Sequence, residues 1–142
     1  MKYKYRKLPS NTDPSQRFIS LPLLQVRLFY GSKYKDVICL LDTGAIDCMF
    51  HTSIADVLGI DVKSGREKTY YGIGGHKVVG HLHTIQLQIQ GFSELVDLEV
   101  AFTDGNDLSL LGQTGFFDNY QVTFERYKGR FQIQSRPRLP TY

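Results

Sequence analysis

The sequence predicts a mainly β protein with one or two short helices, and three observations support this prediction. Apolar and polar residues alternate over segments 85–90 and 97–102, which is the pattern of strands with one buried face. Turn-forming residues separate such segments at spacings that suit β-hairpins. Only residues 52–59 combine a helical spacing of apolar residues with residues that begin and end helices.

The size and composition are those of one globular domain. The chain has 142 residues, of which 42% are apolar and 22% charged, enough to bury a core and too apolar for a disordered or fibrous protein. No uninterrupted apolar run reaches fifteen residues, and no apolar segment follows the charges of residues 1–7. We therefore expect neither a membrane span nor a secretory signal. The two cysteines, Cys39 and Cys48, suit small buried thiols and a cytoplasmic location.

Charge divides the chain into three parts. Residues 1–17 carry five Lys and Arg against one acid, and residues 128–142 carry four with no acid, so each end has a net charge of +4. Residues 18–127 hold eight basic and thirteen acidic residues, a net charge of −5. The sequence predicts a basic N-terminal arm (1–17), irregular over residues 8–17, then one domain (18–134) and a basic, Pro-containing C-terminal tail (135–142).

Turns and one helix punctuate the predicted domain. The turns suit hairpins of an antiparallel sheet, and they fall at Gly31-Ser32, Gly74-Gly75, Gly91, Asp104-Gly105-Asn106-Asp107 and Lys128-Gly129. Residues 52–59 predict a helix that Thr52 or Ser53 caps and Gly59 ends. A second short helical turn is expected after Gly112.

The most informative segment is an apolar strand over residues 37–41 that ends abruptly in Asp42-Thr43-Gly44-Ala45. A carboxylate at the end of a buried strand loses solvation, and it persists there where it has hydrogen-bond donors or a chemical role. The alternative is that Asp-Thr-Gly is only a turn that leaves the strand. The tripeptide alone leaves both interpretations open.

Two further segments bear on that choice. Residues 69–80 follow a hairpin pattern but hold Gly72, Gly74 and Gly75 near the tip, where glycine indicates mobility or a close approach of backbones. Residues 108–111 form an apolar strand that runs into Gly112, where the backbone is expected to pass close to another segment.

Together and in this order, the three segments resemble the retroviral-type (retropepsin-like, single-lobe) aspartic proteases, which are relatives of pepsin. The resemblance covers about residues 20 to 134. It implies a single-lobe acid-protease β-barrel with a flap hairpin, and an aspartic endopeptidase that uses no metal or cofactor. The residues that it assigns are catalytic Asp42; supporting Thr43, Gly44 and Ala45; a flap of Tyr71, Gly72, Ile73, Gly74 and Gly75; and, in the loop behind the site and its subsites, Leu110, Leu111 and Gly112.

The chemistry of this class implies a homodimer. Two carboxylates must share a proton so that one activates water while the other polarises the scissile carbonyl. The sequence holds one apolar-Asp-Thr-Gly pattern, so the second carboxylate is expected from another copy of the chain. The expected substrate is an extended peptide or protein segment, added as a strand beneath the flap, with subsites lined by Ile73, Val79 and Leu111.

One pair of residues departs from the retroviral pattern. Gln113 stands where those proteases commonly have Arg, and Ile46 stands where they have the acid that pairs with it. Because both partners change together, no uncompensated buried charge is left. How the dimer is supported without this ion pair is an open question at the level of sequence.

Other interpretations compete with a protease. The first is a peptide-binding module of the same fold without catalysis. The second is a nucleic-acid binder that uses the basic tails, which the acidic body disfavours. His81 and His83 could form half of a metal site, but no further ligand at suitable spacing completes it. Cys48 could be a nucleophile, but no base lies near it in sequence.

Overall fold

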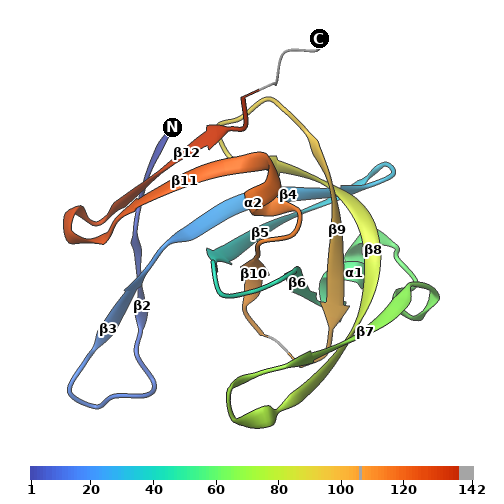
Figure 1. Ribbon diagram of the computed structural model, residues 1–142, viewed down its shortest axis with the longest axis horizontal. Helices are drawn as coiled ribbons and strands as arrows, with labels where there is room; N and C mark the ends of the chain where they lie inside the picture. The colour runs from blue at the N-terminus through green and yellow to red at the C-terminus, as the bar shows by residue number, and fades with distance from the viewer. Residues whose placement is uncertain (106, 138–142) are drawn as a thin grey trace.

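Strands dominate the structure, as the two-residue periodicity predicts (Figure 1). The computed structural model describes residues 1–105 and 107–137. In chain order the elements are β1 (Lys2–Lys4), β2 (Arg6–Pro9), β3 (Phe18–Leu21), β4 (Leu23–Tyr30), β5 (Lys33–Leu41), β6 (Cys48–His51), α1 (Thr52–Leu58), η1 (Val62–Ser64), β7 (Arg66–Tyr71), η2 (Ile73–Gly75), β8 (Lys77–Ile89), β9 (Val96–Thr103), β10 (Ser109–Leu111), α2 (Phe116–Asn119), β11 (Tyr120–Glu125), η3 (Arg126–Lys128) and β12 (Arg130–Ser135).

The largest sheet closes into a barrel. Its strand order is β4-β5-β10-β6-β9-β8-β7, and β4 also pairs with β8, so the strands from β4 to β8 form a ring and β7 extends it. Alternate side chains of these strands point inward and make one core, which includes the fully buried Phe50, Phe102, Leu28 and Leu87. A barrel of this size is filled by its own side chains. The predicted mainly β, single-lobe barrel is confirmed.

Most predicted hairpins form, but the sheet is mixed. The turns at residues 31–32, 74–75, 91 and 128–129 join strands that pair antiparallel. However, β10 runs parallel to β5, and β6 runs parallel to β9, so a wholly antiparallel sheet was the wrong expectation. The predicted turn at 104–107 connects β9 and β10, which are not neighbours in the sheet; its residue Asn106 lies outside the described residues. Turn residues show where the chain reverses, but not which strand it joins next.

Both helices form where the sequence predicts them. Helix α1 ends at Gly59, whose φ of 73° is the left-handed conformation that glycine tolerates. The predicted Thr or Ser cap is wrong, because the N-cap is His51, whose Nδ1 accepts a hydrogen bond from the backbone N–H of Ser53 (3.1 Å). The short helix α2 is the helical turn expected after Gly112. Among the described residues, no helix has both the length and the apolar character needed to cross a bilayer.

The N-terminal segment is more ordered than predicted. Leu8 and Pro9 belong to β2, which pairs with β3, and residues 10–17 form the connection between these two strands. Strand β1 pairs with β12, which pairs in turn with β11. The sequence pattern did not predict β1 and β2, because charges and prolines interrupt the alternation of apolar and polar residues in this segment. The two strands form because their backbones pair with strands elsewhere in the sequence, which outweighs the weak local pattern.

Candidate active site

Asp42 follows directly on the last residue of β5. The backbone N–H of Leu41 donates to the carbonyl of Pro22 (3.1 Å), and that of Asp42 donates to the carbonyl of Leu111 (3.0 Å). The pairing of β5 with β4 thus ends at the residue before Asp42. The half-buried side chain of Asp42 accepts a hydrogen bond from the backbone N–H of Gly44 through Oδ1 (2.9 Å). The tripeptide is therefore a turn, and the same turn holds the carboxylate.

The segment after β10 packs against the Asp42 loop. Strand β10 inserts between β5 and β6, with Leu110 opposite Leu40 on one side. A Cβ atom on Gly112 would collide with the carbonyl oxygen of Asp47 and lie only 2.8 Å from that of Ala45. The close approach of backbones expected at Gly112 is confirmed, and only glycine fits there.

Gln113 connects the two loops through its side chain. Its Nε2 donates to the carbonyl of Thr43 (2.7 Å), while its backbone N–H donates to the carbonyl of Ala45 (2.9 Å). Ile46, at the other departure from the retroviral pattern, is exposed. A neutral amide thus holds the Asp42 loop without an ion pair, which answers how this position is supported within one chain.

The predicted subsite residues divide into accessible and buried ones. Ile73 is fully exposed and Val79 is partly exposed, so both side chains are free to contact another molecule. Leu111 has no exposed surface and belongs to the core. Its prediction as a subsite residue is therefore wrong, because β10 runs through the centre of the sheet with Leu111 facing inward. Leu110, on the other face of the strand, is half-buried.

The glycine-rich segment forms the tip of the β7–β8 hairpin. The backbone N–H of Gly72 donates to the carbonyl of His76 (2.8 Å), which closes the turn. Gly74 and Gly75 have φ values of 81° and 79°, so the turn itself needs glycine at these two positions. Tyr71 before the tip is largely exposed. The predicted hairpin is confirmed, and positive φ is the physical reason for two of its glycines.

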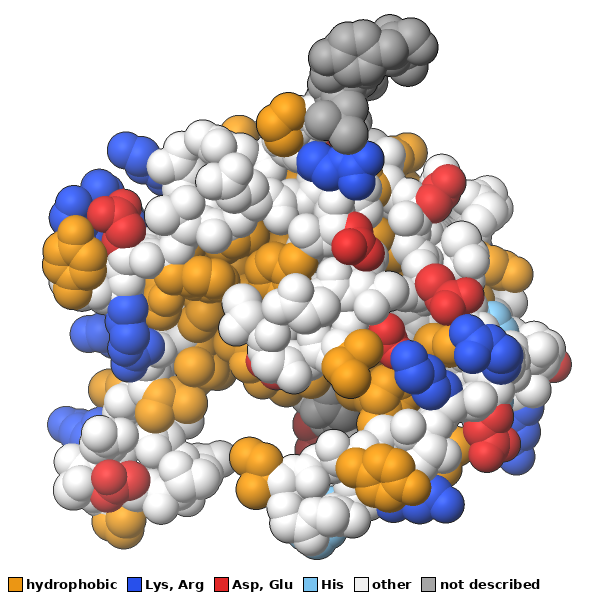
Figure 2. Space-filling model, in the orientation of Figure 1, with side chains coloured by type: hydrophobic (Ala, Val, Ile, Leu, Met, Phe, Trp, Pro, Cys, Tyr) orange, Lys and Arg blue, Asp and Glu red, His pale blue; other side chains and the backbone are white. Residues whose placement is uncertain are grey.

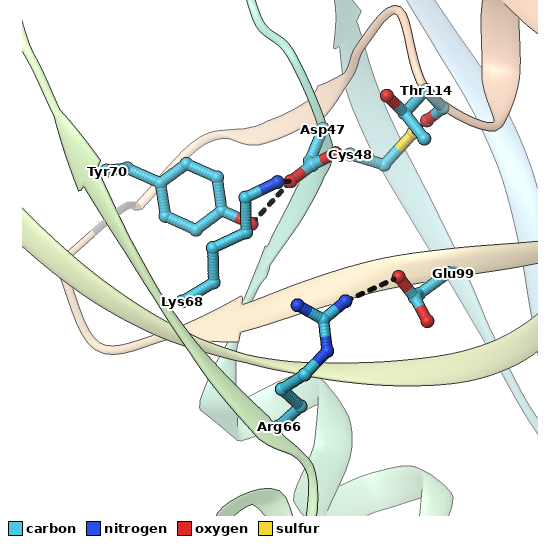
Figure 3. A network of polar contacts seen from close by, with 7 residues as sticks. All are labelled: Asp47, Cys48, Arg66, Lys68, Tyr70, Glu99 and Thr114. Atoms are coloured by element: carbon cyan, nitrogen blue, oxygen red, sulfur yellow. Dashed lines mark hydrogen bonds and ion pairs between the residues drawn. The ribbon is translucent and has the colours of Figure 1, made fainter.

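A polar network around the buried Asp47 links this hairpin to the Asp42 loop (Figure 3). Asp47 is only 6% exposed, and its Oδ2 accepts hydrogen bonds from Lys68 Nζ and from the hydroxyl of Tyr70, each at 2.6 Å. Lys68 and Tyr70 both extend from β7 toward the carboxylate. Farther along the same strand, Arg66 pairs with Glu99 at 3.4 Å. Two of the donors to Asp47 thus come from the strand that leads into the glycine-rich tip.

The network fixes the protonation of its members. Burial acts to raise the pKa of Asp47, but hydrogen bonds from Lys68 and Tyr70 outweigh it and hold that pKa below its ordinary value. Burial, together with the hydrogen bond to Asp47, raises the pKa of the Tyr70 hydroxyl far above its ordinary value. Near neutral pH the carboxylate is ionised and the phenol is protonated, which is the pairing that a hydrogen bond from Tyr70 to Asp47 requires.

The remaining candidates have structural roles. His83 forms a hydrogen bond through Nε2 with the carbonyl of Val62 (2.8 Å). Within residues 1–105 and 107–137, no group of three or more potential ligands could hold a metal ion. Cys39 and Cys48 are buried thiols, as predicted. Burial raises the pKa of Cys48 to about 11, so this thiol is protonated near neutral pH and is a poor nucleophile.

Comparisons with known proteins agree with this geometry. A family model described as aspartyl protease matches residues 25–114, which include the Asp42 loop, the β7–β8 hairpin and Gly112. The chain belongs to this aspartyl protease family. The match ends just after Gln113, so β11, β12 and the N-terminal strands lie outside it.

Solved structures extend the similarity to the fold. A retropepsin-like aspartic protease from Rickettsia conorii superposes with a TM-score of 0.58 and 19% identity, over 79% of this chain and 89% of that one. EIAV protease in complex with the inhibitor HBY-793 superposes with a TM-score of 0.51 and 19% identity, over 73% and 88% of the two chains. At this identity the likeness shows a retropepsin-like fold. A search of curated protein sequences gives no significant match.

Proposed function

We propose that the protein is a homodimeric aspartic endopeptidase in which Asp42 of each copy supplies one carboxylate. The observation that carries this proposal is the placement of Asp42: it is half-buried at the end of a core strand, and the N–H of Gly44 holds one of its oxygens. Its Oδ2 makes no hydrogen bond within the described part of the chain, so this oxygen is available to a second carboxylate, a proton or water.

The reaction needs one proton shared between the two carboxylates. The ionised carboxylate takes a proton from water as the water oxygen attacks the scissile carbonyl carbon, and the protonated one donates its proton to the carbonyl oxygen. The tetrahedral intermediate then collapses: the C–N bond breaks, the amine leaves with the proton that the first carboxylate had gained, and the second carboxylate takes back a proton from a hydroxyl group of the intermediate, which becomes the carboxyl group of the product. No covalent enzyme intermediate forms in this sequence.

A second copy is required because one chain offers one such carboxylate. An isologous contact, in which the same surface is used by both partners, brings the two Asp42 loops together on a two-fold axis. Thr43 and Gly44 are exposed in the single chain, which suits residues that meet their counterparts across the axis. Ala45 is half-buried behind them and completes the loop.

The β7–β8 tip is proposed as the flap over the substrate, formed by Tyr71, Gly72, Ile73, Gly74 and Gly75. Its apolar side chains are exposed although the strands below are paired, so they are free to contact a peptide. An extended peptide binds such an edge through backbone hydrogen bonds, and alternate side chains select its sequence. Ile73 and Val79 remain as subsite candidates, while Leu111 is excluded by burial.

Cleavage of a diverse peptide library between mildly acidic and neutral pH tests this function. We expect the wild type to cut internal bonds and Asp42→Asn, which keeps the side chain's size but loses the ionisable group, to cut none while still binding peptide. A wild type that binds peptides without cutting any, and an Asp42→Asn variant of equal peptide affinity, would leave the peptide-binding module of the same fold as the better description.

A further inference from the structure

A cavity opens at the end of the barrel where β6 and β9 finish. Its volume is about 590 Å³, which lies within the range of about 300–1,000 Å³ for small-molecule sites, and the mouths of barrels are among the places where such sites occur. Its walls come from the segment that runs from α1 through η1, from strand β8, and from the end of β9 with the residue after it. The proposed mechanism of peptide cleavage does not use this cavity.

The cavity is separate from the Asp42 loop. Strand β6 begins directly after Asp47 and leads away from that loop, and the cavity lies at its far end, where α1 begins. His81 of β8 lines the cavity and lies opposite Glu67 in the β7–β8 hairpin. Because successive residues of a strand point to opposite faces, Lys68 reaches Asp47 from one face of the hairpin, and His81 lies on the other.

The buried part of the cavity lining is apolar. Ile60 and Phe102 are 6% and 0% exposed, and Val62, which also lines the cavity, is half-buried and packs against the core. Such side chains can cover the aliphatic part of a ligand, but they offer no partner to a charged group. A charged group therefore has to find its partners among the exposed residues around the opening.

Three carboxylates from three different segments surround the opening: Asp56 on α1, Asp61 before η1, and Asp104 after β9. Asp104 accepts a hydrogen bond from the hydroxyl of Thr52. Within the described residues, the carboxylates of Asp56 and Asp61 make no hydrogen bond or ion pair, and the side chain of Asp61 does not cap η1. Lys63 also lines the cavity, and it forms no ion pair within the same part of the chain. Two carboxylates are thus free to receive a cation.

The charge around the cavity favours a cation as well. Three carboxylates outnumber Lys63 and His81, so the lining keeps a negative charge even when the histidine is protonated. Residues 18–127 carry a net charge of −5. On the face shown in Figure 2, most acidic side chains lie over the barrel, and few lie over the strands that project at the left of the view. A cleft with low-dielectric walls focuses such a field and raises the local concentration of cations.

We propose that this cavity binds an organic cation: an ammonium or guanidinium group on a short aliphatic chain. Asp56 and Asp61 receive the charged group, while Ile60 and Val62 cover the chain. A bare metal ion does not suit the cavity, because no group of three or more metal ligands occurs within residues 1–105 and 107–137. The site needs neither a second copy of the chain nor peptide cleavage, so it goes beyond the proposed function.

Titrations of the isotope-labelled full chain, followed by NMR, test the site with three probes. Cadaverine and acetyl-lysine methylamide carry an ammonium group, whereas acetyl-norleucine methylamide keeps the aliphatic chain without the charge. We expect both cations to give saturable shifts that concentrate in residues 52–64, 79–81 and 102–104. The norleucine derivative should bind about 10-fold more weakly than the lysine derivative, or worse, because it cannot donate a hydrogen bond to a carboxylate.

Two variants show whether the named carboxylates are responsible. Asp61→Asn should raise the dissociation constant of both cations about 10-fold, and Asp56→Asn is a second variant with the same expectation. Asp97→Asn is the matched control, because Asp97 is an exposed acid at the other end of β9 and its loss changes the net charge equally. Circular dichroism must show wild-type strand content in each variant. Equal effects of Asp61→Asn, Asp56→Asn and Asp97→Asn would mean that the cations respond only to net charge, and would overturn the proposal.

The probes also separate two sources of the same chemistry. Tighter binding of the lysine derivative assigns the site to a lysine or arginine side chain of another protein, and tighter binding of cadaverine assigns it to a free amine; either result supports a cation site. The absence of saturable shifts with both cations overturns the proposal, as does a norleucine derivative that binds as tightly as the lysine derivative. Asp42→Asn should bind the cations like the wild type, so the site and the proposed activity can fail separately.

Discussion

The hydroxyl of Tyr70 donates a hydrogen bond of 2.6 Å to the carboxylate of Asp47, and so ties the first strand of the β7–β8 hairpin to the loop that starts at Asp42. Lys68 reaches the same carboxylate oxygen from the same strand. Because Asp47 is buried, losing either donor leaves a charge that water cannot solvate well. The position of the hairpin relative to the Asp42 loop thus depends on interactions made by its first strand.

Removal of the Tyr70 hydroxyl tests this dependence. We expect Tyr70→Phe to lower the free energy of unfolding by about 1.5–3 kcal/mol, the range for a hydrogen bond to a charged group. The matched control is Tyr71→Phe, because the neighbouring Tyr71 is largely exposed and makes no side-chain hydrogen bond within the described residues. Urea unfolding of both variants and the wild type measures the difference. Equal losses in the two variants would mean that the bond to Asp47 adds nothing.

The lowered pKa of Asp47 predicts how stability depends on pH. A carboxyl whose pKa is lower in the folded chain than in the unfolded chain stabilises the fold above its ordinary pKa of 3.8, and this stabilisation is lost as pH falls through the folded-state value. We therefore expect the wild type to be more stable than Asp47→Asn at pH 7, and this advantage to shrink below about pH 4. Unfolding free energies at several pH values measure it. An advantage that is constant between pH 7 and pH 3 would contradict the assignment.

Gly112 offers a test of the loop packing behind the site. Gly112→Ala places a methyl group against two backbone carbonyls that cannot move independently, and we expect a loss of about 2 kcal/mol or more in the free energy of unfolding. In Gly72→Ala the new methyl group would meet its nearest atom at 3.8 Å, and the residue has a negative φ, so this variant serves as the control. Thermal unfolding compares the two. A Gly112→Ala protein as stable as the control would show that the two loops do not pack as described.

Much of the candidate site was predictable from the sequence because its signals are local. The end of an apolar strand at Asp42, the glycines at the hairpin tip and the glycine after β10 each follow from the preferences of a few adjacent residues. The polar network around Asp47 was not predictable in this way. Asp47 lies 21 residues from Lys68 and 23 from Tyr70, and they meet only because β7 extends the barrel on one side of the Asp42 loop.

The fold shows the same division between local and distant information. The period of two predicted strands and hairpins correctly, but the parallel pairs β5–β10 and β6–β9 join segments that are far apart in sequence. A buried acid between a turn and a strand, such as Asp47, is a signal that could have pointed to the network. A buried carboxylate needs a cation or a hydrogen-bond donor, so this signal directs attention to the cations that the neighbouring strands supply.

Subunit mixing tests most directly the central claim, that two copies of Asp42 form one site. Wild type and Asp42→Asn are mixed and equilibrated at a constant total concentration well above the dimer dissociation constant, and peptide cleavage is measured against the fraction of wild type. Mixed dimers hold one ionisable carboxylate and should be inactive, so activity should follow the square of the wild-type fraction, about one quarter at an equal mixture. Activity proportional to the wild-type fraction would show that each chain works alone, and would contradict the shared site.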